Sequence, residues 1–559
     1  MSNLTNEKPC LVQAKQGFSV SYKNKFLYSK YNPQATIEKL ISELTIPEGT
    51  LVIVNSPVLF YGINLLINKL SENSFILAIE HDKNLYDFSI ECAESNFNKV
   101  QNEISNFIYL NLQTQNDILS LFNNKNFTKK IRCCKRAIKI NLSAIINEYE
   151  IFYQNIFSYF TNYISQFWKN RITLTKLGKL YSKNIFLNLP KISNSKNIIF
   201  NSIEKPIIVF GAGTSLDKTI KDFESAKISL NDFFIICVDS ALKPLLNYGI
   251  NPDIVVAVES QLANEKAFIG TKNFPYLLIS DLTSRPNINN YHKKNISFIF
   301  TEYCNANFLD TILKLNLPIK KFIPLGSVGL YAIQLAINLR KSHSPIFFTG
   351  LDFAFTLDNT HCKDAPASFT KKINSNRINS SINVLPAYKI GTTKFNLNEK
   401  NIFTDKALLN YANQFIELFY DEKNFYNISD VSIFNCLELN SHKIQTIKPN
   451  EIINKLENKN IDKHFDNKNF YQSVENKLDI KNYLLNEIDS LNKLKENLST
   501  GNESIEKIKE QIDLHDYLFL HFPDGNNGAK TDTSFLKRVR NEIDFFLKIL
   551  NRSLNQFEK

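Results

Sequence analysis

A pair of glycines between an apolar run and a helical pattern is the first feature of this sequence that could do chemistry. Residues 207–220 read IIVFGAGTSLDKTI. Glycine lets backbone N–H groups face an anion, and the positive end of the next helix adds to the attraction. The third glycine of an ordinary NAD fingerprint is missing, and the alternative interpretation is a tight turn without a ligand. The predicted nucleotide-binding loop is Gly211, Ala212, Gly213, Thr214 and Ser215.

Acidic residues follow five further apolar runs. Carboxyl ends of parallel strands meet at one edge of a sheet, so these acids are expected at one edge. Carboxylates there could bind Mg²⁺, sugar hydroxyls or a pterin-like ring, and the alternative is that polar residues simply begin loops. The residues concerned are Asp239 with Ser240, Glu259, Asp281, Glu302 and Asp352. Asp239 and Ser240 are also predicted to bind the nucleotide.

Capping patterns begin two of the predicted helices. Thr214 with Asp217 resembles a capping box, in which two side chains engage the first free N–H groups of a helix. Residues 326–329 read GSVG before an amphipathic pattern, with Ser327 as the cap. The start of this second helix predicts another anion pocket, in which Ser327 is expected to bind the nucleotide. The alternative is an ordinary helix cap.

One histidine lies close to these motifs in the sequence. His361 follows Asp352 by nine residues, in the polar stretch TGLDFAFTLDNTHC. Histidine titrates near neutral pH, so in a cleft it is suited to general acid or base catalysis. The alternative is a solvent-exposed loop histidine.

The elements that must position these residues form an alternating pattern. Each run is almost continuously apolar, as expected for parallel strands covered by helices on both faces. Helical patterns separate most of the runs, so the middle of the chain predicts a doubly wound α/β sheet. The expected strands are 207–210, 233–238, 254–258, 276–280, 297–301 and 345–349.

Three domains are expected in a chain of 559 residues. Residues 1–190 alternate strand and helix and then become helical, although Asn55-Ser56-Pro57 stands where a dinucleotide fold has glycines. This first unit is therefore interpreted as not a nucleotide site. Residues 191–445 hold the predicted catalytic sheet, and residues 446–559 predict a bundle of amphipathic helices with loops at 499–504 and 523–528.

Composition limits the classes of function. No apolar run is long enough to span a membrane, and the N-terminus lacks the pattern of a secretory signal. The eight cysteines form no C-x-x-C pair, which favours a reduced, cytoplasmic protein without a cysteine-based zinc site. The net charge of +11 comes from lysines that are spread among Asn, Asp and Glu and form no compact basic patch, so no nucleic-acid partner is expected.

The order of four motifs resembles a known family. GAGTSLDKTI, VDSALKPLLNYGINPDIVVAVESQ, LGSVGLYAIQLAINL and FFTGLDFAFTLDNTHC are similar to the motility-associated factor (Maf) family. These bacterial proteins share the DUF115 domain, also called 6-hydroxymethylpterin diphosphokinase MptE-like. The resemblance covers roughly residues 190–445 and reaches weakly into the helical lead-in before them.

The resemblance implies a sialyltransferase-like Rossmann domain and a glycosyltransferase activity. Members of the family are associated with transfer of a nonulosonic acid from a CMP-sugar to Ser or Thr of flagellin, with no tightly bound cofactor. Archaeal relatives instead transfer diphosphate from ATP to a hydroxymethylpterin with Mg²⁺. A non-catalytic flagellar assembly or binding protein is the third interpretation. Flanking domains favour the glycosyltransferase, because a large acceptor needs more than the middle domain.

Site residues follow from the same resemblance. Gly211, Gly213 and Ser215 match the family's G-x-G-P-S-L loop, with Thr214 in place of proline. Other matches are Asp239, Asp253, Glu259, Ser327 and Asp352, and Glu259 stands where Asp is common. His361 is the first candidate for the base that deprotonates the acceptor, followed by Asp352, and Glu259 is the third catalytic candidate. Asp239, Glu259 and Asp352 would hold Mg²⁺ in the diphosphokinase alternative.

Overall fold

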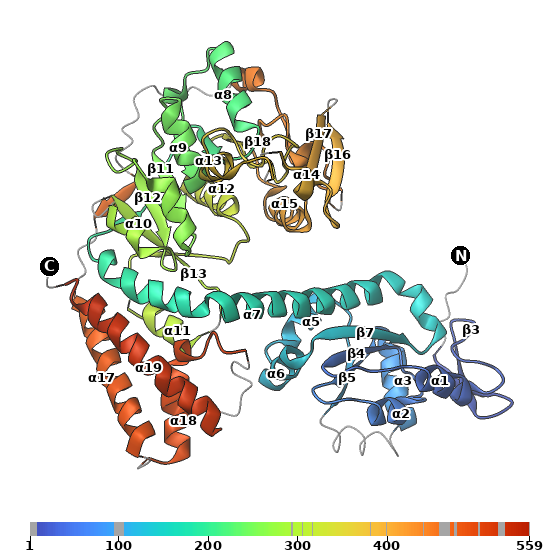
Figure 1. Cartoon of the computed structure of the whole chain (residues 1–559). Coiled ribbons are helices and arrows are strands. Elements are labelled where there is room, and N and C mark those ends of the chain that lie inside the picture. The colour runs from blue at the N-terminus through green and yellow to red at the C-terminus, as the bar shows by residue number, and fades with distance from the viewer. Residues whose placement is uncertain are drawn as a thin grey trace. The chain divides into compact units, whose positions relative to one another are not determined.

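The computed structural model divides the chain into two compact units, residues 1–173 and 174–559, and each is described by itself. The boundary falls within one long helix, α7 (Glu150–Ile192), drawn in turquoise in Figure 1. The prediction of three domains is not tested by this division and stays a prediction. The structure describes residues 8–93, 106–291, 295–304, 306–315, 317–341, 343–378, 380, 382–397, 400–439, 441–457, 470–473, 478–500, 503–523 and 532–557.

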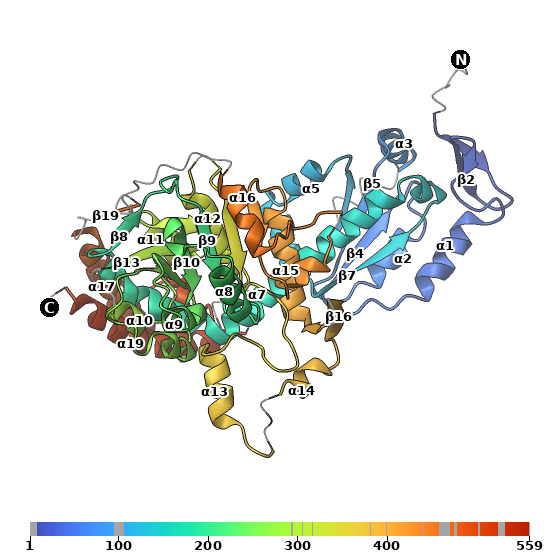
Figure 2. The same cartoon turned by 90° about the horizontal axis from the view of Figure 1, so that it is seen from above.

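A four-stranded parallel sheet organises the first unit, in the order β6-β5-β4-β7. Its strands β5, β4 and β7 are labelled in Figure 2. Alternate residues of β4 face opposite cores, so that Val52 and Val54 join one hydrophobic cluster while Leu51 and Ile53 join the other. An antiparallel sheet of β1, β2 and β3 precedes it in the chain. The strands are β1 (Cys10–Gln13), β2 (Phe18–Tyr22), β3 (Lys25–Phe26), β4 (Thr50–Asn55), β5 (Phe75–Glu80), β6 (Phe107–Asn111) and β7 (Arg136–Asn141).

Helices of the first unit separate these strands. The predicted alternation of strand and helix is confirmed here, but the apolar run 57–70 forms a helix only in its second half, at α2. The antiparallel strands and β7 were not predicted, because they are short or interrupted by charged residues. The helices are α1 (Pro33–Ser42), α2 (Ile63–Asn68), α3 (Lys83–Ala93), α5 (Gln115–Leu121) and α6 (Lys125–Cys133).

A ten-stranded sheet organises the second unit, in the order β18-β15-β9-β10-β11-β12-β13-β8-β19, with β14 beside β13. All neighbouring strands are parallel except β19 against β8. The chain crosses from β9 to β13 in one direction, and β15 and β18 lie on the other side of β9. The strands are β8 (Lys196–Ile198), β9 (Ile207–Phe210), β10 (Phe234–Val238), β11 (Ile254–Ala257), β12 (Leu277–Asp281), β13 (Ile296–Thr301), β14 (Lys320–Phe322), β15 (Ile346–Thr349), β18 (Phe425–Asn427) and β19 (Tyr471–Ser473).

All six strands predicted for this sheet are confirmed to within one residue, and the predicted α/β fold class is confirmed with them. The helices that follow the strands are α8 (Leu216–Ser225), α9 (Asp239–Asn247), α10 (Pro286–Tyr291), α11 (Asn307–Leu313), α12 (Val328–Leu339), α13 (Pro366–Asn374), α14 (Val384–Ala387), α15 (Lys406–Phe419) and α16 (Ile452–Glu457). A small antiparallel pair, β16 (Thr393–Leu397) and β17 (Lys400–Thr404), lies between α14 and α15 in the chain.

Three helices close the chain: α17 (Leu478–Thr500), α18 (Ile505–Leu514) and α19 (Thr533–Leu554), shown in red in Figure 1. They share one hydrophobic core with the sheet and with α7, where the rings of Phe186, Tyr517 and Phe546 contact one another. Helix α17 continues through Thr500 into the predicted loop 499–504, and residues 524–528 of the other predicted loop lie outside the described residues. Among the described residues, no helix combines the length and apolar character needed to cross a bilayer.

Candidate active site at the carboxyl edge of the second sheet

The loops after β9 and β15 meet at the point where the strand order changes direction, which is where open α/β sheets bind ligands. The Gly211 N–H donates to Thr349 O at 2.8 Å, and the Gly213 N–H donates to Gly350 O at 2.7 Å. A Cβ added at Gly211 would overlap Gly350 O. Glycine is therefore required here because the backbones of the two loops are in direct contact and leave no room for a Cβ atom. The prediction that these two amides face an anion is wrong, because both donate within the protein.

Asp352 lies at the N-terminus of α8, where an anion was expected. Its Oδ2 accepts hydrogen bonds from the Ser215 N–H at 2.9 Å and the Thr214 hydroxyl at 3.3 Å. Its Oδ1 accepts one from the Ser215 hydroxyl at 2.5 Å. The side chain is 2% exposed, and burial raises the pKa of Asp352 to about 6. Asp352 therefore serves α8 as an internal carboxylate cap. Its predicted parts in catalysis and metal binding stay predictions.

The predicted capping box of Thr214 and Asp217 is not formed. Helix α8 has Ser215 as its N-cap, without a local side-chain cap. Asp217 instead accepts hydrogen bonds from the Lys363 N–H at 2.7 Å and the Tyr248 hydroxyl at 3.0 Å. The carboxylate of Asp352, which is distant in the sequence, caps the N-terminus of α8 instead of a local side chain, because the loop after β15 lies against that end of the helix.

His361 is brought next to the glycine loop, as its place in the sequence predicted. The neighbouring Cys362 N–H donates to Ala212 O at 2.9 Å. His361 itself is half-buried, with Nδ1 3.1 Å from the Thr360 hydroxyl. Burial lowers the pKa of His361, so its imidazole is neutral at pH 7 and able to accept a proton. The role of His361 as the general base stays a prediction.

Asp239 and Glu259 follow the neighbouring strands β10 and β11. Asp239 is 6% exposed, and its Oδ1 accepts the Ser240 N–H at 2.6 Å. Burial raises the pKa of Asp239 to about 6, and the negative charge of Glu259 adds to the rise. The half-buried Glu259 accepts the Gln261 N–H at 3.0 Å. These two acids form a pair at the same edge as the glycine loop.

The predicted three-acid metal site is not assembled. Within the described part of the chain, no three His, Cys, Asp or Glu side chains lie close enough to hold one ion. Asp352 follows β15 and Asp239 follows β10, with β9 between these strands. The third member, Glu259, follows β11, so the strand order spreads the set along the edge.

Ser327 caps α12, as predicted. Its hydroxyl accepts the Leu330 N–H at 3.4 Å. A Cβ added at Gly329 would lie 2.6 Å from Leu351 Cδ2, and Leu351 also fills the space beside Gly211. The first turn of α12 is therefore packed close to the glycine loop. The anion pocket predicted at Ser327 stays a prediction.

Ser429 belongs to the same cluster and was missed. Its hydroxyl lies 2.9 Å from the Ser215 hydroxyl and accepts the Gly350 N–H at 3.3 Å. Ser429 follows β18, a three-residue strand that was not predicted. The signal was present in FYNISD, a short aromatic run followed by polar residues, but the run is too short to be distinguished from a loop.

Two asparagines of α7 that hold the loops after β11 and β12 were also missed. Asn184 Nδ2 donates to Ser260 O and, at 2.8 Å, to Thr283 O. Asn188, one helical turn later, donates from Nδ2 to Leu282 O at 3.0 Å and to Ser284 O. Both side chains are fully buried. Two amides four residues apart in an otherwise apolar segment were the available signal.

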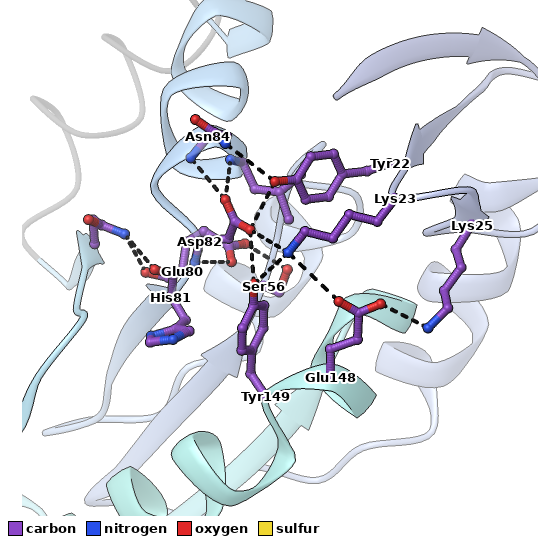
Figure 3. A network of polar contacts seen from close by, with 12 residues as sticks. Tyr22, Lys23, Lys25, Ser56, Glu80, His81, Asp82, Asn84, Glu148 and Tyr149 are labelled. Atoms are coloured by element: carbon purple, nitrogen blue, oxygen red, sulfur yellow. Dashed lines mark hydrogen bonds and ion pairs between the residues drawn. The ribbon is translucent and has the colours of Figure 1, made fainter. Parts of the chain in front are cut away.

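The corresponding edge of the first sheet is filled by a network of side chains (Figure 3). After β5, the Asp82 carboxylate accepts hydrogen bonds from Tyr22 at 3.0 Å, Lys23 at 3.2 Å and Tyr149 at 3.1 Å. Although burial works in the other direction, these hydrogen bonds hold the pKa of Asp82 below its ordinary value. Tyr22 ends β2 and Lys23 begins the turn between β2 and β3, and their hydrogen bonds attach this turn to the edge.

A second acid of the first unit lies deeper. Glu80 is fully buried at the end of β5 and accepts the Ser56 hydroxyl at 2.6 Å and the Tyr153 hydroxyl at 3.3 Å. Burial raises the pKa of Glu80 to about 7. The Ser56 hydroxyl in turn accepts a hydrogen bond from the Ser143 hydroxyl at 2.7 Å. Side chains of the unit itself occupy the place where Asn55-Ser56-Pro57 replaces a glycine loop.

The fold of the second unit is a doubly wound α/β fold with a mainly parallel sheet. Residues 183–358 match the family model described as 6-hydroxymethylpterin diphosphokinase MptE-like. The chain is 30% identical over 563 aligned residues to an uncharacterized protein of Treponema pallidum (strain Nichols), covering 97% of this chain and 95% of that protein. The chain therefore belongs to the MptE-like, or DUF115, family, as the four motifs predicted.

A solved structure extends the likeness beyond the middle of the chain. It is the Maf glycosyltransferase from Magnetospirillum magneticum AMB-1, with a TM-score of 0.55 and 12% sequence identity. The match covers 99% of this chain and 93% of that one. At this identity the likeness concerns the fold, which the two proteins share along nearly the whole chain.

Proposed function

We propose that this chain is a glycosyltransferase of the Maf type, which transfers a nonulosonic sugar from a CMP-sugar to Ser or Thr of flagellin. The observation that carries the proposal is the length of the fold match, which covers 99% of the chain. A small acceptor such as a pterin needs only the middle domain. The match to a Maf glycosyltransferase includes the parts that flank the middle domain, which supports a large acceptor.

In this proposal His361 takes the proton of the acceptor hydroxyl. It is half-buried beside the glycine loop, and its lowered pKa keeps the imidazole neutral at pH 7. Asp352 holds α8 and the loop in place through Ser215 and Thr214. Glu259, paired with Asp239, would contact sugar hydroxyls from the adjacent strands.

Diphosphate transfer from ATP to a pterin is the second candidate, favoured by the description of the matching family model. Mg²⁺ is expected in that reaction, and Asp239 with Glu259 is the acid pair available to bind it. The separation of Asp352 from this pair along the strand order makes this candidate the weaker one.

The experiment is incubation of the full chain with flagellin and a CMP-nonulosonate, followed by intact-mass measurement of the flagellin. The proposal expects a mass gain of one sugar residue, loss of the gain in His361→Gln, and retention of it in the surface variant Lys537→Gln. Unchanged flagellin mass with CMP-activated sialic, pseudaminic and legionaminic acids would contradict the proposal. Formation of pterin diphosphate from ATP and Mg²⁺ would establish the second candidate instead.

A further inference from the structure

A cavity of about 1300 Å³ lies within the second unit, away from the glycine loop. The C-terminal half of α7, the loop between β12 and α10, and the last turns of α19 form its walls. It is large enough for a small metabolite with its bound water. Among its lining residues are Lys183, Asn184, Arg285, Asn289, Lys548 and Arg552.

Positive charge is concentrated in this cavity. Lys183, Arg285 and Arg552 all line it. Burial lowers the pKa of Lys183, and the charges of Arg285 and Arg552 lower it further. Lys191 and Lys548 also line the cavity. This accumulation of like charge is unfavourable without an anion, because each cation raises the energy of its neighbours.

The acids near the cavity are already engaged. Glu265 pairs with Arg285 through Nε at 2.6 Å. Asp544, the acid among the lining residues, pairs with Lys495 at 2.6 Å. The cations therefore outnumber the acids around the cavity.

Two buried acceptors in the cavity wall lack hydrogen bonds. Asn184 is 0% exposed and Asn289 is 1% exposed, and the Oδ1 atom of each has no partner. Their orientations are set, because Asn184 Nδ2 donates to two backbone carbonyls and Asn289 Nδ2 donates to Asn188 Oδ1 at 3.0 Å. A buried acceptor without a donor is costly, so each Oδ1 calls for an O–H or N–H from a ligand.

We propose that this cavity binds a small organic phosphate that carries hydroxyl groups, such as a sugar phosphate or a nucleotide. The phosphate meets Lys183, Arg285 and Arg552, and ligand hydroxyls donate to the carboxamide oxygens of Asn184 and Asn289. A concave site with buried, unpaired acceptors in its wall fits a small ligand better than a nucleic acid, which a convex basic surface would contact.

The site adjoins the catalytic edge without belonging to it. The Arg285 N–H donates to Glu259 O at 3.1 Å, so a ligand held by Arg285 bears on the loop that carries Glu259. The inference does not depend on the transferase activity, because it rests on the charges and unpaired acceptors of the cavity.

Calorimetric titration of the full chain tests the proposal with glucose 6-phosphate, CMP, inorganic phosphate and glucose as probes. We expect saturable binding of at least one of the two organic phosphates, at least about tenfold weaker binding of inorganic phosphate, and none of glucose. The double variant Lys183→Gln/Arg552→Gln should weaken binding at least about tenfold. The matched variant Lys537→Gln/Arg540→Gln removes the same amount of charge from exposed positions of α19 that do not line the cavity, and it should bind as the native chain does.

Other results would overturn the assignment. Equal affinity for inorganic phosphate would show that ligand hydroxyls contribute nothing to binding. Equal weakening in both double variants would show that net charge, and not the cavity, accounts for the effect. Binding of a single-stranded oligonucleotide or an acidic peptide, without either organic phosphate, would assign the surface to a macromolecule. Circular dichroism of each variant establishes that the fold is retained.

Discussion

In the first unit, Ser56 follows β4, Glu80 ends β5 and Asp82 follows β5, and these residues hydrogen-bond with side chains of the same unit. In the second unit, the loops after β9 and β15 contact each other through the backbones of their glycines. Both edges thus use the carboxyl ends of parallel strands for internal contacts. They differ in what is left over. At the first edge the acids are hydrogen-bonded within the unit, and one buried acceptor, Asn55 Oδ1, lacks a partner. The second unit has a cavity with surplus cations as well as two unpaired acceptors.

This comparison shows that acids at strand ends do not by themselves define a ligand site. Asp82 and Asp352 are both held by side chains of the protein, and each fixes a neighbouring element, the β2–β3 turn in one unit and α8 in the other. Capacity for a ligand is found where charges or hydrogen-bonding atoms lack a partner.

The largest expected effect is on the glycine contact of the second unit. In Gly213→Val, a Cβ would overlap Asp352 Oδ2 and lie 2.6 Å from Gly350 O. Because backbone cannot move aside, we expect a loss of about 3 kcal/mol or more in the free energy of unfolding of this unit. Urea unfolding, detected by hydrogen exchange of the backbone amides of β9 and β15, measures this loss of stability. Gly178→Ala, where the new Cβ has ordinary contacts, is the control, and equal stability of the two variants would contradict the prediction.

The next effect concerns the buried acid of the first unit. Glu80 has its pKa raised from 4.5 to about 7, so the folded state holds its proton more tightly than the unfolded state. This group therefore lowers stability as pH rises from about 4.5 to about 7, by up to about 3 kcal/mol. Glu80→Gln should remove that loss. The fluorescence of Trp168, the single tryptophan, follows unfolding of the first unit.

The control for this pH dependence is Glu91→Gln, which changes an exposed acid of the same unit. It should leave the pH profile as it is in the native chain. A native profile in Glu80→Gln as well would show that Glu80 does not carry the effect.

A smaller effect with the opposite pH dependence is expected for Asp82→Ala. Asp82 is stabilised in its charged form, so its contribution is present above the ordinary pKa of 3.8 and is lost as pH falls through its lowered folded pKa. We expect a loss of about 2 kcal/mol near neutral pH, shrinking under acid conditions. The exposed Asp87→Ala should cost less than about 0.5 kcal/mol by the same Trp168 measurement, because solvent screens its pair with Lys83.

If Asp82→Ala and Asp87→Ala destabilised the first unit equally, the network in Figure 3 would be no more than a set of surface contacts. The first edge would then be open in solution, and the difference between the two sheets would disappear.

Sequence pattern was sufficient for the strands that build the second sheet. Runs such as 207–210 are apolar throughout, because both faces of a central strand are covered. The short strands β18 and β8 were missed because they have three residues each, too few for a periodicity. His361 was placed correctly beside the glycine loop, since strand ends that share an edge also bring their loops together.

The sequence by itself determined the class of fold, the family and the edge at which polar residues gather, because these follow from local composition and motif order. Only the tertiary structure decided which groups remain available there. Whether the amide of Gly213 faces a ligand or Gly350, and whether the oxygen of Asn184 finds a donor, depends on partners distant in the chain. Local pattern carries no information on such pairings, since they are set when separate elements pack against one another.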